Sequence, residues 1–107
     1  MSKLNKIERQ IERLMHSEFV AKGGEVFSFP DAGVTVVMRE VFPGSKMVQV
    51  AIAFAGADEP EFLSDVGRYH ALNRFDGMEF LTVPRPTNWF AFAVNLANTI
   101  TENPDGF

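Results

Sequence analysis

Three side chains that can take part in chemistry follow one another at intervals of four near the N-terminus: Glu8, Glu12 and His16. On a helix this spacing places two carboxylates and an imidazole along one side, a set that can bind a divalent cation or serve in acid–base catalysis. Because no further cluster of ligands in the sequence converges on them, we interpret them as the solvated flank of a helix and predict no metal site. The pair Glu12/His16 is the first candidate for a small enzyme.

A run of acidic residues precedes a second helical segment. Asp58 is expected to cap that helix, and the carboxylates beside it complement the positive end of the helix dipole. Asp65 and His70 form the second candidate pair for acid–base work, although five residues of separation turn them to different sides of a helix. We also consider these acidic residues a candidate face for binding a partner protein, and we call them the acidic face: Asp58, Glu59, Glu61 and Asp65.

A basic ribbon about three turns long lies on the first helical segment, opposite its leucines and isoleucines. Such a face can contact phosphates, an acidic lipid surface or an acidic protein, and its plainer interpretation is a solubilising face. Aromatic side chains do not alternate with the cations, so stacking on single-stranded bases is not supported. The ribbon consists of Lys3, Lys6, Arg9 and Arg13.

Apolar residues recur on the same segment with the spacing of a coiled-coil seam. Two heptads are too short to establish a coiled coil from the sequence, so two interpretations stay open. The stripe either packs on the protein's own sheet or forms the seam of a homodimer. Its residues are Leu4, Ile7, Ile11 and Leu14.

Arg85 and Trp89 lie in and just after the rigid Pro84-Arg85-Pro86 turn. Arginine and tryptophan are enriched at interface hot spots, and a segment fixed by prolines loses little entropy on binding. We consider them a candidate hot spot, with a tryptophan that covers the edge of the core as the alternative.

Other classes of site lack a motif. The scattered glycines form no phosphate-cradling pattern, and the chain has no cysteine for a disulfide, a thiolate nucleophile or a thiolate metal site, so we predict no cofactor. The N-terminal segment lacks the apolar core of a signal peptide, and the longest apolar run, at 47–57, is too short to cross a bilayer. We therefore expect a cytoplasmic protein that does not bind membranes.

The order of elements is expected to be α-β-β-β-α-β-α in one domain over residues 1–107. Helical periodicity covers residues 2–19, with Ser2 as the cap, and Gly23-Gly24 end the helix. Alternating residues then predict an antiparallel meander, with alanines that let another layer approach its third strand. The second helix is expected from Asp58, with Pro60 in its first turn. The last helix is apolar almost all round and is expected to be buried on two sides, either against the sheet and a neighbouring element or in an oligomer interface. Strands are predicted at 25–29, 34–42, 46–55 and 78–83, and the last helix at 89–100, capped by Thr87 or Asn88.

The fold class is therefore α+β, with about four antiparallel strands packed against helices. Charge is uneven: residues 1–22 carry five basic and three acidic side chains, and residues 55–107 carry three basic and eight acidic ones. An acidic body does not favour nucleic acid as the main partner. We rank first a non-enzymatic protein-binding domain, an inhibitor or adaptor of the kind that phages use against host enzymes or nucleic-acid-binding complexes. A self-assembling homodimer that is structural or binds a small ligand comes second, and a small enzyme third.

Overall fold

The computed structural model describes residues 3–54 and 63–102 of the chain. Three helices and four strands follow one another in the order predicted from the sequence, and the strands form one antiparallel sheet, which confirms the α+β class. The elements are α1 (Lys6–Ala21), β1 (Glu25–Phe29), β2 (Val34–Glu40), β3 (Met47–Phe54), α2 (Ser64–Asp76), β4 (Leu81–Pro84) and α3 (Trp89–Glu102).

The sheet has the strand order β1-β2-β3-β4, and every neighbouring pair is antiparallel. β2 and β3 are central and pair along their whole length, with Val36 opposite Ile52 and Val37 opposite Ala51. Because successive side chains point to opposite faces, each of these strands contributes to two cores. The prediction that β3 is central and covered on both sides is confirmed.

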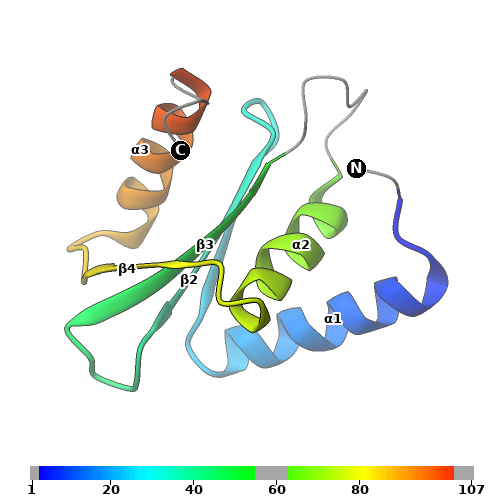
Figure 1. Cartoon of the computed structure of the whole chain (residues 1–107), viewed down its shortest axis with the longest axis horizontal. Helices are drawn as coiled ribbons and strands as arrows, with labels where there is room; N and C mark the ends of the chain where they lie inside the picture. The colour runs from blue at the N-terminus through cyan, green and yellow to red at the C-terminus, as the bar shows by residue number, and fades with distance from the viewer. Residues whose placement is uncertain (1–2, 55–62, 103–107) are drawn as a thin grey trace.

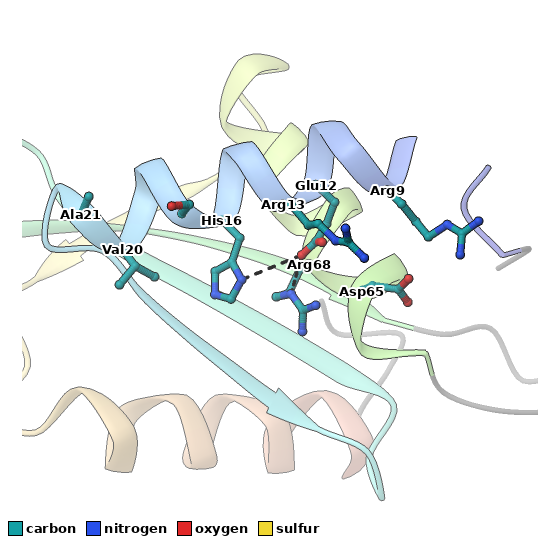
Figure 2. Close-up of a pocket in the computed structure, with 9 residues that line it drawn as sticks. Arg9, Glu12, Arg13, His16, Val20, Ala21, Asp65 and Arg68 are labelled. Carbon is teal, nitrogen blue, oxygen red and sulfur yellow. Dashed lines mark hydrogen bonds and ion pairs between the residues drawn. The ribbon is translucent and has the colours of Figure 1, made fainter. Parts of the chain in front are cut away.

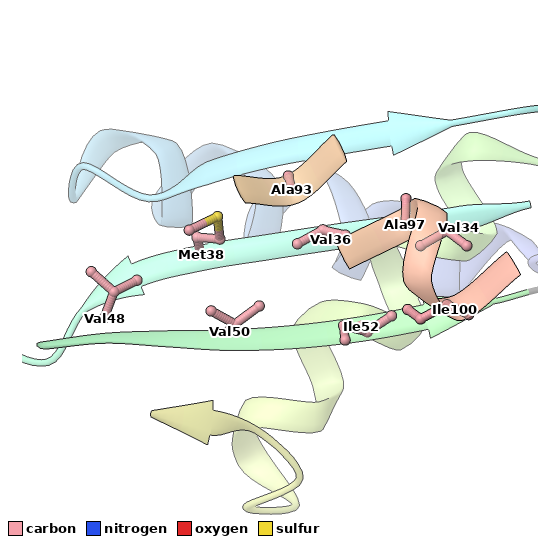
Figure 3. Packing of buried hydrophobic residues seen from close by; sticks show 9 residues of the cluster. All are labelled: Val34, Val36, Met38, Val48, Val50, Ile52, Ala93, Ala97 and Ile100. Atoms are coloured by element: carbon pink, nitrogen blue, oxygen red, sulfur yellow. The ribbon is translucent and has the colours of Figure 1, made fainter. Parts of the chain in front are cut away.

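One face of the sheet is covered by α3 (Figure 1). The small side chains of Ala93 and Ala97 let this helix approach β1 and β2, and with Ile100 they belong to the same core cluster as the valines of β2 and β3 (Figure 3). Asn88 caps the helix, since its Oδ1 accepts from the amide of Ala91 at 3.0 Å. Within the described chain only the side toward the sheet is buried and Phe90 is 58% exposed, so burial of the second side against another element of the same chain is not found, and burial in an oligomer interface stays a prediction.

The opposite face is covered by α2, with α1 lying against α2 and β1 (Figure 1). Ala71, Leu72 and Phe75 of α2 pack on the small side chains Ala51 and Ala53 of β3, as the alanines of that strand predicted. The Phe19 ring of α1 stacks on Phe75 with centroids 5.7 Å apart. The sheet therefore lies between two helical layers, one formed by α1 and α2 and the other by α3.

Several predicted boundaries are wrong for identifiable reasons. α2 begins at Ser64, with Leu63 at its N-cap and no side-chain cap, so the expected start at residue 58 is wrong; Asp58 and Pro60 themselves lie outside the described residues. α1 begins at Lys6 rather than after Ser2, because Asn5 and Glu8 form a reciprocal capping box there. β4 begins at Leu81 rather than Met78, whose positive φ of 60° is not strand geometry. Of the expected acidic face, Asp58, Glu59 and Glu61 lie outside the described residues.

Gly23 and Gly24 end α1 as predicted. Gly23 has a φ of +88°, its amide donates to the carbonyl of Val20, and the amide of Gly24 donates to that of Phe19. These two bonds form a Schellman motif, which satisfies carbonyls at the end of the helix. Gly24 is needed for a further reason, since a Cβ there would lie 2.5 Å from the Phe19 ring.

We predict that Gly24→Ala lowers the free energy of unfolding by about 1–3 kcal/mol, the usual cost of overpacking. The Phe19 ring that it displaces is the one that stacks on Phe75. Gly77→Ala is the matched control, because the nearest atom to a Cβ there is the flexible end of Glu79 at 3.3 Å, and the carbonyl oxygens of Arg74 and Asn73 lie at ordinary contact distances of 3.8 and 3.9 Å. Urea denaturation of both variants measures the difference. Equal losses would show that the Phe19 contact does not restrict position 24.

Candidate functional site

The rotation of α1 about its axis decides which of its residues are available on the surface. The helix turns Glu12 into the interior, with Met15 and Phe19 half-buried beside it. As a result Ile7, Ile11 and Leu14 face outward and are 67%, 40% and 72% exposed.

The apolar stripe is thus divided between two environments. Leu4 alone of its four residues is buried, so the interpretation that the whole stripe packs on the sheet is wrong. The interpretation as a seam for a second copy stays a prediction.

A charged cluster holds α1 against α2. The Glu12 side chain is 4% exposed, and its Oε1 accepts from Arg68 Nε of α2 at 2.5 Å. The same oxygen lies 3.9 Å from Nδ1 of His16 (Figure 2). One buried carboxylate therefore positions a guanidinium and an imidazole at the same place between the two helices.

An open hollow of about 600 Å³ lies beside this cluster. Its charged lining comes from α1 and from the first turns of α2, as Figure 2 shows. Three guanidinium groups and one imidazole meet two carboxylates there, so the lining has an excess of positive charge. The charged and titratable residues are Arg9, Glu12, Arg13, His16, Asp65 and Arg68.

The residues of the predicted basic ribbon are all exposed in the described chain. The structure brings Arg9 and Arg13 together with Arg68 at the hollow, while Lys3 lines a smaller neighbouring one. Asp65, the one described member of the expected acidic face, lines both hollows among these cations. It therefore contributes to a mixed, mainly basic surface rather than to an acidic one.

The two candidate acid–base pairs have different placements. Glu12 and His16 are neighbours, but Glu12 is buried and pairs with Arg68, so its carboxylate is already used in holding the helices together. Asp65 lines the hollow, whereas His70 is exposed and lies edge-on to Tyr69, with ring centroids 5.5 Å apart. Over residues 3–54 and 63–102, no hydrogen bond or ion pair joins Asp65 to His70, and no three potential ligands gather for a metal ion.

The candidate hot spot is held by contacts within the chain. Arg85 forms an ion pair with Glu40 of β2, and its guanidinium lies 5.3 Å from the centre of the Trp89 ring. Trp89 is half-buried against the core that α3 covers. These contacts fasten the connection between β4 and α3 to the sheet, and a role in binding a partner stays a prediction.

Sequence reasoning missed Arg68, which completes the site from α2. Arg68 is separated from Glu12 by 56 residues, and no local pattern pairs them. One available signal was the i,i+4 pair Met15 and Phe19, which shares a side of the helix with Glu12 rather than with Ile7. Weighting that pair above the leucines would have turned Glu12 toward the core.

Comparison of the chain with protein-family models, with curated protein sequences and with solved structures finds no match. Within the described residues, none of the helices is both long enough and apolar enough to cross a membrane.

We predict that Arg68→Met lowers the free energy of unfolding by about 3 kcal/mol, because it leaves the Glu12 carboxylate buried beside His16 alone. Arg74→Met on the same helix is the control and should cost less than about 1 kcal/mol, since its partner Glu79 is exposed. The double variant Glu12→Met/Arg68→Met should recover most of the loss, because no unpaired charge is left buried. Chemical denaturation measures all three, and a double variant less stable than Arg68→Met would contradict this account.

We also predict that Glu40 titrates at unusually low pH. A hydrogen bond from Arg85, and a second from the Gly44 amide, hold the pKa of this carboxyl below its ordinary value. The pair therefore stabilises the fold above the ordinary glutamate pKa of about 4.3, and this contribution is lost as the pH falls through the lower folded value. Carboxyl NMR titration should show the pKa rising toward normal in Arg85→Gln. It should stay unchanged in Arg74→Gln, and a normal pKa in the parent protein would contradict the prediction.

Proposed function

We propose that this chain is a non-enzymatic protein-binding domain, an adaptor or inhibitor, that docks on its partner through the outer face of α1. The observation that carries the proposal is the exposure of Ile7, Ile11 and Leu14, at 67%, 40% and 72%, on a helix that buries a glutamate instead. Large apolar side chains aligned on one exposed helix face are typical of helix-in-groove recognition.

The expected chemistry of the partner also draws on the exposed charges of the same helix. Lys6, Arg9 and Arg13 are exposed on a different side of α1 from the stripe. A partner that offers an apolar groove to the stripe and carries carboxylates where it meets these cations complements both features and would be steered toward α1 at low ionic strength. The absence of cysteine supports the cytoplasm as the compartment for this binding.

The charges also bear on a second copy of the chain as the occupant. Two identical helices could meet along Ile7, Ile11 and Leu14, because the cations Lys6, Arg9 and Arg13 lie on another side of α1 and would not face each other across that seam. A homodimer along this stripe is therefore treated as an outcome of the experiment below.

The variant Ile7→Gln/Leu14→Gln tests the proposal. Both side chains are exposed, so stability should change by no more than about 0.5 kcal/mol per site. Loss of two apolar anchors should weaken partner binding by roughly 100-fold or more. The matched control is Phe42→Gln/Met78→Gln, which removes two exposed apolar side chains elsewhere, at 61% and 75% exposure.

The measurement is affinity capture from the lysate of the source cell with the three tagged proteins at low and high salt, combined with sedimentation of each pure protein. A stoichiometric partner that is lost only with the α1 variant, and weakened by salt, supports the proposal. Sedimentation as a dimer that only the α1 variant abolishes would instead assign this face to a second copy. Equal behaviour of the two variants would overturn the proposal.

A further inference from the structure

The hollow between α1 and α2 has the features of a site built to hold an anion. Arg68 Nε and His16 Nδ1 both lie within 4 Å of the same oxygen, Glu12 Oε1. Since Glu12 is almost fully buried, its hydrogen bond fixes the orientation of the Arg68 side chain before any ligand arrives, and the His16 imidazole lies beside the same carboxylate. Preorganised donors bind more tightly because little rotamer entropy is lost.

The donors have capacity left for a ligand. Glu12 uses only Nε of Arg68, and no hydrogen bond within the described residues reaches the two terminal nitrogens of that guanidinium. The Arg68 side chain is 24% exposed and lines the hollow. Arg13 is exposed on α1 at the same hollow, and no ion pair in the described part of the chain engages it.

Figure 2 shows how the polar groups are distributed around the hollow. The guanidinium groups of Arg13 and Arg68 lie near the middle, with the imidazole of His16 on one side and Arg9 with Asp65 on the other. Asp65 repels an anion at its own end, so the anion should lie toward Arg13, His16 and Arg68. A carboxylate at the far end can accept hydrogen bonds from hydroxyl groups of the same ligand.

We propose that this hollow binds the phosphate group of a small phosphorylated ligand, with Arg13, His16 and Arg68 as the hydrogen-bond donors. A phosphate dianion matches the three donors better than a carboxylate does, because it offers more acceptor oxygens and twice the charge. The hollow, at about 600 Å³, has the size of ordinary small-molecule sites.

The test is a titration of the pure protein with inorganic phosphate, followed in ¹H–¹⁵N NMR spectra that include the arginine Nε–H groups. Sodium chloride holds the ionic strength constant, and acetate is titrated in parallel as a carboxylate probe. We expect saturable shifts confined to the residues around the hollow, with a dissociation constant of about 1 mM for phosphate and at least tenfold weaker binding of acetate.

Arg13→Gln should weaken phosphate binding about tenfold, the usual effect of one lost charge-assisted hydrogen bond. Lys46→Gln is the matched control, since it removes the same charge from an exposed position in the β2–β3 turn, outside the lining of the hollow, and should change binding less than twofold.

Three results would overturn the proposal: shifts that do not saturate, equal effects of the two variants, or acetate binding as tightly as phosphate. The experiment needs no protein partner, so its outcome is independent of the role proposed for the apolar stripe.

Discussion

The ion pair between Glu12 and Arg68 is the contact on which the arrangement of α1 depends. A carboxylate taken out of water without a partner costs several kcal/mol, so the helix is stable only when Glu12 faces the guanidinium of α2. That requirement fixes the rotation of α1 and thereby the direction of every other side chain on it. The exposure of Ile7, Ile11 and Leu14 follows from a charge pair on another side of the same helix.

The rotation also explains why one helix offers two separate surfaces. Its apolar stripe lies on one outer side, and its arginines lie next to α2, where Arg68 and His16 complete a hollow. The first surface suits an apolar groove, and the second suits a small charged group. Because different side chains build them, substitutions can address each without disturbing the other.

The fold was predictable because its signals are local. Strands β1, β2 and β3 show alternating or β-branched residues between turns that contain glycine and proline. The alanines of β3 indicate that a helical layer packs close to this strand. The site was less predictable, since it rests on a contact between residues 56 positions apart. The leucines and isoleucines alone turn Ile7 and Leu14 inward; the Met15/Phe19 pair indicates the other rotation, and the position of Arg68 in three dimensions explains why Glu12 can be buried. The start of α2 was misjudged for a similar reason, because the acidic run at 58–61 resembles a first turn, whereas the helix begins at Ser64 without a side-chain cap.

The attachment of α1 has a consequence for how the molecule fluctuates. This helix lies against α2 and β1 and joins the sheet through Gly23-Gly24, whereas β2 and β3 are buried between α2 and α3. Its release would leave the hydrogen-bonded centre of the sheet intact, so we expect α1 to open as a separate cooperative unit at a lower free energy than the central strands. Its amide protons would then exchange with solvent well before those of the central strands. A molecule bound to either surface of α1 would slow that exchange, because binding would stabilise the helix in its docked position.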